Sequence, residues 1–330
     1  MRIFVTGITG FVGGTVANYF ASLGHSVSGI GRSNQLPRRI SERCCYKQAD
    51  ICNPLEYIDA DVVIHAAGLA SDTAPSQELF NVNVNGTRNV LNACKTVRHF
   101  VQISSSSVYS FGRDPMIETQ AGININDLSD YGKSKFEAEK YVINNGNDLK
   151  KTILRPRAIY GRYDYSLLPR LMRLVKGNYL LLPQHLSKKI SLTHIDNLIQ
   201  AIELCVCEQK KALKIFNVAD EEVYDLCQVL TTLLPLVAGI QLKKITIPVP
   251  VFNLFVAFNN WFKLSRTFNR FAVSSLTTTA ILNIDKIKYQ VNYDPLNNFY
   301  NSYREIIDWV HNEEGWKQVF NAPPKLSPAL

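Results

Sequence analysis

The 330-residue sequence has no CxxC pair among its seven cysteines, and no group of Cys and His residues has the spacing of a metal site. Cys44 and Cys45 are adjacent, and Cys205 and Cys207 are separated by one residue, so neither pair has the pattern of a disulfide framework. Free cysteines of this kind are usually small core residues. We therefore expect reduced thiols and no metal site.

The sequence also lacks a signal peptide and a hydrophobic run long enough to cross a membrane. A strand pattern begins at once, over Arg2–Thr6, and leaves no room for a leader. The longest apolar stretches are interrupted by Pro248, Pro250, Asn253 and Asn259. These absences predict a cytoplasmic protein.

Acidic residues are missing from one long segment, between Leu226 and Ile284, although the whole chain carries both signs and a net charge of +8. Such an excess suits a phosphorylated cofactor, an anionic substrate or an acidic membrane surface, and it also serves solubility. No Lys/Arg cluster of the nucleic-acid-binding type accompanies it. We therefore expect no nucleic-acid partner.

Strand and helix patterns alternate over the first half of the chain. The predicted strands are 3–5, 27–30, 61–65, 100–104 and 152–155, and the predicted helices are 11–23, 76–97 and 131–144. Repeated βα units with short connections predict an α/β fold with a doubly wound, Rossmann-like parallel sheet.

The length and the change of pattern after Arg155 predict two domains. Residues 1–157, together with about 188–220, are expected to form the NAD(P)-binding Rossmann domain, because 216–218 has the pattern of one more sheet strand. About 158–187 and 221–330 are expected to form a smaller, helix-rich substrate-binding domain.

A glycine-rich turn, TGITGFVG at 6–13, follows the first strand. Its glycines allow a tight turn, a close approach to a pyrophosphate and close packing of the helix, whose N-terminus supplies free N–H donors. GxxGxxG alone is weak evidence, but its place between strand and helix predicts dinucleotide binding. The predicted contact residues are Gly7, Thr9, Gly10, Phe11, Val12 and Gly13.

The second strand ends at Gly31, where an NAD-binding protein usually has an acidic residue for the ribose 2′-hydroxyl. Arg32 follows directly. A missing carboxylate with a guanidinium beside it suits a 2′-phosphate, so we expect NADP(H) to be favoured over NAD(H). The alternative is that Arg32 is a solvated loop charge.

Tyr131 and Lys135 are four residues apart on a predicted helix, so their side chains share one face. A phenol with an ordinary pKa of ~10 is a poor proton donor at neutral pH, and a nearby cation stabilises its phenolate. YxxxK is common by chance. A Ser-rich stretch at 104–107, however, precedes it at the end of a predicted strand, where ligand sites of such sheets lie.

These motifs, in this order, resemble the extended short-chain dehydrogenases/reductases, the NAD-dependent epimerase/dehydratase family. They are TGITGFVG at 6–13, ADI at 49–51, HAAG at 65–68, NVNG at 83–86, SSSSVY at 104–109, YGKSK at 131–135 and LRP at 154–156. SLTHID at 191–196 and the segment from Asp285 to Trp309 fit the C-terminal half of the same family.

The resemblance implies roles for individual residues. Ser105, three residues before the Val-Tyr pair, would polarise the substrate oxygen, Tyr131 would be the acid/base, and Lys135 would tune Tyr131 and hold the nicotinamide ribose. The further cofactor contacts that it implies are Asp50 and Ile51 beside the adenine, then Ala66, Ala67, Gly68, Asn83 and Pro156.

The segment after the LR strand distinguishes branches of the family. Several sugar-nucleotide enzymes carry Asn where this chain has Ala158. The segment 154–161, with LPR at 168–170 and IP at 247–248, is more similar to the branch of 3β-hydroxysteroid dehydrogenases, sterol-4-carboxylate dehydrogenases and 2-alkyl-3-oxoalkanoate reductases. Arg162 departs from the family's frequent YGP turn.

The resemblance thus implies an NAD(P)(H)-dependent oxidoreductase that interconverts a secondary alcohol and a ketone on a hydrophobic, sterol- or lipid-like small molecule. The alternative is a sugar-nucleotide 4-epimerase or dehydratase with bound NAD, which the arginines at 157, 162, 170 and 173 keep open. A non-catalytic NADP-binding regulator is disfavoured, because Ser105, Tyr131 and Lys135 are all present.

Two further expectations concern surfaces. Apolar residues recur at helical spacing from Val251 to Phe262 within a segment flanked by basic charges, so 247–271 is predicted to be an apolar lid with peripheral membrane contact, or else an interior helix. The resemblance and the apolar stripe of Phe80, Val84, Val90 and Leu91 predict a homodimer through the helices at 76–97 and 131–144, unless the stripe faces its own sheet.

Overall fold

The computed structural model describes residues 1–71, 73–110, 114–146, 149–184, 186, 188–208, 212–251 and 278–312. The predicted lid lies outside the described residues from 252 onwards.

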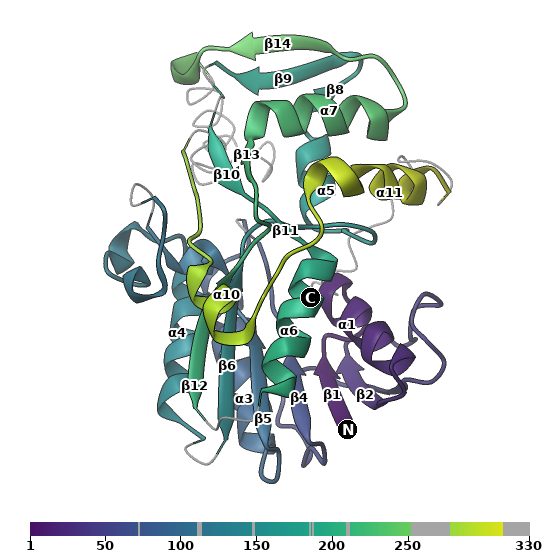
Figure 1. Cartoon of the computed structure of the whole chain (residues 1–330), viewed down its shortest axis with the longest axis vertical. Coiled ribbons are helices and arrows are strands. Elements are labelled where there is room, and N and C mark those ends of the chain that lie inside the picture. Colours follow the sequence, from purple (N-terminus) through teal and green to yellow (C-terminus); the bar gives the residue numbers. More distant parts are fainter. Residues whose placement is uncertain are drawn as a thin grey trace.

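A parallel sheet of seven strands, in the order β12-β6-β5-β4-β1-β2-β3, forms the lower half of the molecule in Figure 1. The strands are β1 (Arg2–Thr6), β2 (Ser26–Gly31), β3 (Cys45–Gln48), β4 (Val62–His65), β5 (His99–Ile103), β6 (Lys150–Pro156) and β12 (Leu213–Val218). The neighbouring strands β4, β5 and β6 are buried along their whole length, as expected when helices cover both faces. The predicted Rossmann-like α/β fold is confirmed.

Two hydrophobic cores cover the two faces of this sheet. One contains the inner sides of α1 (Phe11–Ser22) and α6 (Ile195–Cys207), and the other contains those of α3 (Gly86–Ala93) and α4 (Asp130–Asn144). The loops that carry the sequence motifs lie at the carboxyl ends of the strands.

The prediction of a single helix over 76–97 is wrong. The structure has α2 (Ser76–Phe80), a π-helical turn (Asn81–Asn85) and α3, which ends at Ala93. The Thr87 hydroxyl donates to the Asn83 carbonyl at 2.6 Å within the widened turn. Val84, Val90 and Leu91 of the apolar stripe are buried in the protomer itself, so they do not form an intermolecular surface.

A third hydrophobic core lies in the upper half of Figure 1, among α5, α7 and α11. A small sheet of order β14-β9-β8 covers it, and the sequence did not predict this sheet. The remaining elements are β7 (Ile159–Tyr160), α5 (Leu167–Met172), β8 (Val175–Lys176), β9 (Tyr179–Pro183), β10 (Lys189–Ser191), β11 (Thr193–His194), β13 (Val223–Asp225), α7 (Leu226–Ala238), β14 (Lys243–Ile247), α10 (Asp285–Val291) and α11 (Phe299–Asn312).

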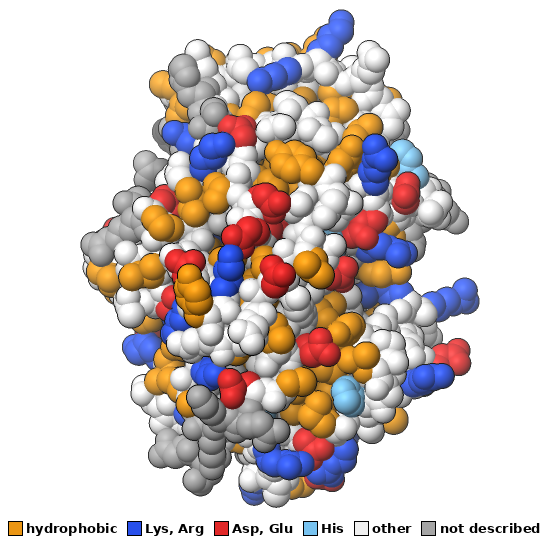
Figure 2. Space-filling view, viewed as in Figure 1, with side chains coloured by type: hydrophobic (Ala, Val, Ile, Leu, Met, Phe, Trp, Pro, Cys, Tyr) orange, Lys and Arg blue, Asp and Glu red, His pale blue; other side chains and the backbone are white. Residues whose placement is uncertain are grey.

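Charged side chains of both signs are intermixed with hydrophobic ones on the face shown in Figure 2. The basic excess is therefore not gathered into one patch on that face. Among the described residues, no helix combines the length and the hydropathy that a membrane span requires.

Candidate active site

The glycine-rich turn after β1 lies against the loop after β4. Gly7 has a φ of +71°, and a Cβ at this position would lie 2.9 Å from the backbone of Ala67. A Cβ on Gly13, at the start of α1, would lie 2.3 Å from the Gly7 carbonyl oxygen. These contacts need glycine. They bring together the predicted cofactor residues of 7–13 and the Ala66–Ala67 pair.

The end of β2 explains why no acidic side chain stands at position 31. A Cβ on Gly31 would lie 2.7 Å from the Thr9 hydroxyl, so the glycine-rich turn occupies the space of a side chain. Arg32 is exposed. Burial and Asp50 raise the pKa of the Cys52 thiol to about 11, and the positive charge of Arg32 acts in the opposite direction. Arg32 therefore lies beside the segment predicted to hold the adenine.

Asp50 and Ile51 are held between β3 and α3. The Asp50 carboxylate accepts a hydrogen bond from Cys52 N at 2.9 Å, and the Asn89 amide donates to the Ile51 carbonyl at 2.8 Å. A Cβ on Gly86 would meet the Ile51 side chain at 2.6 Å, so α3 approaches this loop closely. The sequence-predicted residues of the adenosine side thus gather at one corner of the sheet.

Ser105, Tyr131 and Lys135 come from neighbouring elements. Ser105 precedes the 3₁₀ turn Ser106–Val108, and its hydroxyl accepts a hydrogen bond from Ser107 N at 3.1 Å. A Cβ on Gly132 would lie only 2.2 Å from the Ser107 carbonyl oxygen, so the first turn of α4, with Tyr131, packs directly on this loop. One turn further along α4, the Lys135 ammonium donates to the Ile103 carbonyl at 2.8 Å.

Asn83 connects the loop after β4 with α4. Its amide accepts from Leu69 N at 2.8 Å and donates to the Leu69 carbonyl and to the Ser134 hydroxyl. A Cβ on Gly68 would lie 3.1 Å from the Asn83 side chain and 3.9 Å from the Lys135 ammonium. The π-helical turn places Asn83 in this position, and such turns often occur at functional sites.

Burial sets the charges of this region. It lowers the pKa of Lys135 to about 8, although the nearby Glu139 carboxylate raises it. Burial, with the Lys135 charge as a second cause, lowers the pKa of His65 to about 3. His65 is therefore neutral and bridges the Thr6 and Thr87 hydroxyls, at 2.7 and 2.9 Å.

A buried ion pair behind the site was not predicted. Arg155, 2% exposed, donates from Nε and Nη2 to the two oxygens of the fully buried Glu139, at 3.0 and 2.6 Å. Its Nη1 donates to the Tyr109 hydroxyl, which in turn donates to Asn217. The available sequence signal was the position of Glu139, four residues after Lys135 on the same helix face.

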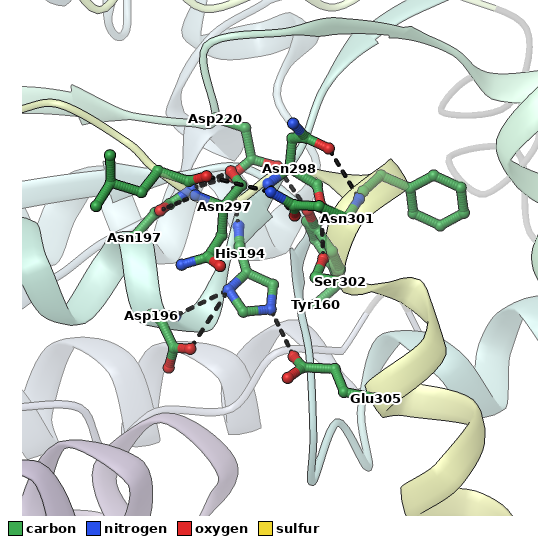
Figure 3. A network of polar contacts seen from close by, with 12 residues as sticks. Tyr160, His194, Asp196, Asn197, Asp220, Asn297, Asn298, Asn301, Ser302 and Glu305 are labelled. Carbon is green, nitrogen blue, oxygen red and sulfur yellow. Dashed lines mark hydrogen bonds and ion pairs between the residues drawn. The ribbon is translucent and has the colours of Figure 1, made fainter.

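A second polar network joins the sheet to the C-terminal part (Figure 3). The buried Asp220 carboxylate accepts from His194 N and from the Asn197 amide, both at 2.7 Å, and from the hydroxyls of Tyr160 and Tyr224. The His194 ring also contacts the Glu305 carboxylate of α11 at 2.8 Å. The sequence had shown only the strand-to-helix step at 191–196.

The fold and this site define a class of protein: Rossmann-type proteins whose glycine-rich turn and YxxxK helix meet at one sheet edge. The NAD dependent epimerase/dehydratase family matches residues 3–219, and this chain belongs to it. Its enzymes include reductases and dehydrogenases, and the chain is an enzyme of this oxidoreductase and epimerase group.

Two curated reductases are similar to the chain. It is 28% identical over 256 residues to a 2-alkyl-3-oxoalkanoate reductase of Shewanella oneidensis, covering 70% of this chain and 65% of the relative. It is 27% identical to a 4-hydroxy-2-methyl-3-oxo-4-farnesyl-3,4-dihydroquinoline-1-oxide ketoreductase of Stigmatella aurantiaca, covering 71% and 72% of the two chains. The match to the first reductase thus spans less than two thirds of that protein.

Solved structures share the fold over nearly the whole chain. UDP-glucuronic acid 4-epimerase from Bacillus cereus in complex with NAD has a TM-score of 0.73 at 20% identity and covers 97% of this chain and 100% of its own. UDP-glucose 4-epimerase from Thermotoga maritima has a TM-score of 0.75 at 18% identity, with coverage of 95% and 100%. At this identity the likeness defines the fold.

Proposed function

We propose that the protein interconverts a secondary alcohol and a ketone on an apolar small molecule, with NAD(P)(H) as hydride carrier. The observation that carries the proposal is the close packing of Gly132 on Ser107, together with the bond from Lys135 to Ile103. These two contacts hold Tyr131, Lys135 and Ser105 at the carboxyl edge of the sheet, where cofactors bind in such folds.

The bound cofactor would supply a hydride. Its predicted contacts fit a dinucleotide, because the glycine-rich turn has no side chains at its closest approaches and can present backbone N–H groups to a phosphate. In reduction, Tyr131 gives a proton to the carbonyl oxygen, Ser105 donates a hydrogen bond to the same oxygen, and the Lys135 cation favours the resulting phenolate. The names of the curated reductases support an apolar ketone.

Tyr131→Phe tests this assignment. The variant loses the proton donor but keeps the ring, so turnover should fall by ~100-fold or more while the cofactor still binds. The measurement is NAD(P)H consumption with a long-chain ketone, beside cofactor affinity from fluorescence. Near-normal turnover would refute the role of Tyr131.

The proposal includes a preference for NADP(H). Its support is that Thr9 occupies the side-chain space of Gly31 and that Arg32 is exposed beside Asp50 and Cys52. Arg32→Ala should weaken NADPH binding by ~10-fold or more and leave NADH binding nearly unchanged, since only NADPH carries the 2′-phosphate. Equal weakening of both cofactors, or a wild-type preference for NADH, would count against it.

The proposal also assigns parts of the chain. Residues 1–157 and about 188–220 bind the cofactor, and about 158–187 and 221–330 bind the substrate. The proposal also includes a homodimer that pairs the helices over about 76–97 and 131–144. Light scattering that gives a particle of 37 kDa, the mass of one chain, would exclude the dimer.

A further inference from the structure

The small sheet of β8, β9 and β14, at the upper end of the molecule in Figure 1, has two unlike faces. Side chains alternate between the two faces along a strand, and residues that pair across strands share a face. In β9, Leu180 and Leu182 are 2% and 0% exposed and belong to the third hydrophobic core. They define the inner face, so Tyr179 and Leu181 lie on the other.

The register of the strands adds three residues to this outer face. Tyr179 pairs with Lys176 of β8 and with Lys243 of β14. Leu181 pairs with Ile245 of β14. The outer face of the small sheet is therefore defined by Lys176, Tyr179, Leu181, Lys243 and Ile245.

The outer face is apolar where water would favour polar side chains. Tyr179 is 46% exposed and Ile245 is 41% exposed. Neither these two residues nor Leu181 belongs to a hydrophobic core of the described part of the chain. A sheet with one solvated face usually carries polar residues on that face. Apolar side chains gathered on an exposed face indicate a contact surface.

The chain segments that build the small sheet carry no negative charge. Neither 165–195, which contains β8 and β9, nor 226–284, which contains β14, has an Asp or a Glu. Lys176 and Lys243 are exposed on the outer face itself. Lysines beside apolar side chains, without acidic residues among them, complement a surface that is both apolar and anionic.

We propose that the outer face of the small sheet docks the protein on an anionic lipid membrane. Lys176 and Lys243 contact the phospholipid headgroups. Tyr179, Leu181 and Ile245 reach the boundary between headgroups and acyl chains, where the amphipathic ring of tyrosine is favoured. This surface goes beyond the proposed function, and it lies outside the lid predicted over 247–271.

A second copy of the chain fits the outer face less well. In a two-fold contact the same face meets itself, so the lysines of both copies would be brought together. Lys243 and Lys244 also lie in β14, which is an edge strand, and lysine in an edge strand discourages pairing with another strand. A membrane supplies the negative charge that a second copy does not.

The small sheet belongs to the part of the molecule that covers the candidate active site. Arg170 of α5, the helix before β8, donates to the Ala70 carbonyl in the loop after β4. A membrane at this end of the molecule would therefore face the carboxyl edge of the large sheet rather than its amino edge.

Co-sedimentation of the full chain with lipid vesicles tests the docking. Vesicles of equal parts phosphatidylglycerol and phosphatidylcholine should bind wild type at least ~10-fold more tightly than vesicles of phosphatidylcholine alone, because each lysine near an anionic surface adds to the attraction. High salt should weaken this binding. No binding to the anionic vesicles, or equal binding to both lipids, would overturn the proposal.

Two variants assign the binding to the outer face. The double variant Lys176→Gln, Lys243→Gln should bind the anionic vesicles ~10- to 30-fold more weakly. Ile245→Asn should weaken the binding by ~10-fold or more, since it removes an apolar side chain from the contact. The matched control is Lys47→Gln with Lys95→Gln, which removes the same charge from exposed positions of the large-sheet part and should bind nearly as wild type does. Urea unfolding should be close to wild type in all three, because the changed side chains are exposed.

Wild-type vesicle binding by the double lysine variant or by Ile245→Asn would overturn the proposal, because another surface would then make the contact. Self-association in light scattering that Ile245→Asn abolishes, without vesicle binding, would assign the outer face to a second copy. These measurements use neither cofactor nor substrate, so they are independent of the proposed function, which fails through normal turnover of Tyr131→Phe.

Discussion

Lys135 holds a positive charge where water hardly reaches. Its side chain is 6% exposed, and its Nζ donates to the Ile103 carbonyl. Burial lowers the pKa of Lys135 to about 8, and the Glu139 carboxylate raises it in opposition. The charge that is proposed to favour the Tyr131 phenolate is therefore lost in a mildly alkaline range.

This pKa predicts an alkaline limit of activity. The rate of ketone reduction should be level below about pH 8 and fall above it, as Lys135 loses its proton. Initial rates at saturating cofactor, from pH 6 to 10, measure it. A rate that stays level to pH 10 would contradict the assignment.

The free energy of unfolding is not expected to fall over the same pH range as the rate. Between about pH 8 and the usual lysine pKa of 10.5, the unfolded chain binds a proton at Lys135 that the folded chain has lost. The contribution of Lys135 to the free energy of unfolding therefore rises with pH in that window. Urea unfolding at pH 7.5 and 9.5 separates the two effects.

At the scale of single residues, motifs predict the residues whose type the proposed chemistry or the backbone conformation requires. Gly7, Tyr131 and Lys135 belong to that group. Glu139 does not, because what distinguishes it is its partner Arg155 on another element. Such pairing depends on the register of β5, β6 and α4, which one sequence does not specify.

At the scale of elements, the sequence pattern predicted every strand of the large sheet except β3, and it predicted the helices α1 and α4. Each of these elements carries its own pattern. The sequence did not predict the π-helical turn at 81–85 or the small β14-β9-β8 sheet. The turn depends on the Thr87 hydroxyl and on the partners of the Asn83 side chain. Two strands of the small sheet carry little apolar alternation, because β8 has only two residues and β14 is mostly exposed.

The contact between α4 and the Ser105 loop gives a prediction for one element. Gly132→Ala places a methyl group 2.2 Å from the Ser107 carbonyl oxygen, so the helix must move away. We expect a loss of ~1–3 kcal/mol in the free energy of unfolding and at least ~10-fold lower turnover, as Tyr131 shifts.

Gly86→Ala is the matched control, because its methyl group meets the flexible end of the Ile51 side chain at 2.6 Å. It should cost less stability and little turnover. Urea unfolding and steady-state rates compare the two variants, and equal effects on turnover would mean that the α4 contact does not position Tyr131.

For the whole molecule, Asp220 connects the sheet with the C-terminal part. Its four donors come from α6 and its N-terminus, from β7 and from β13. Figure 3 shows Tyr160, His194 and Asn197 beside this carboxylate. Asn197 extends the network, as its amide also donates to the Asn297 carbonyl at 2.7 Å. The elements around α11, β7 and β13 are thus connected to the large sheet by buried hydrogen bonds.

Asp220→Asn should lower the free energy of unfolding by ~2–4 kcal/mol, because an amide nitrogen would face two of these donors inside the core. Glu305→Gln, at the exposed side of the same network, keeps an acceptor for His194 and should cost less than ~1 kcal/mol. Urea unfolding of both variants measures the difference. Equal losses would show that Asp220 is not the centre of the network.

The most direct test of the hydride-transfer account is to follow deuterium from cofactor deuterated on the nicotinamide, with long-chain ketones and with UDP-glucose as alternative substrates. The account predicts stoichiometric cofactor oxidation with the ketone and deuterium on the new alcohol carbon. Conversion of UDP-glucose into its 4-epimer without net cofactor turnover, and no reaction of the ketones, would contradict it.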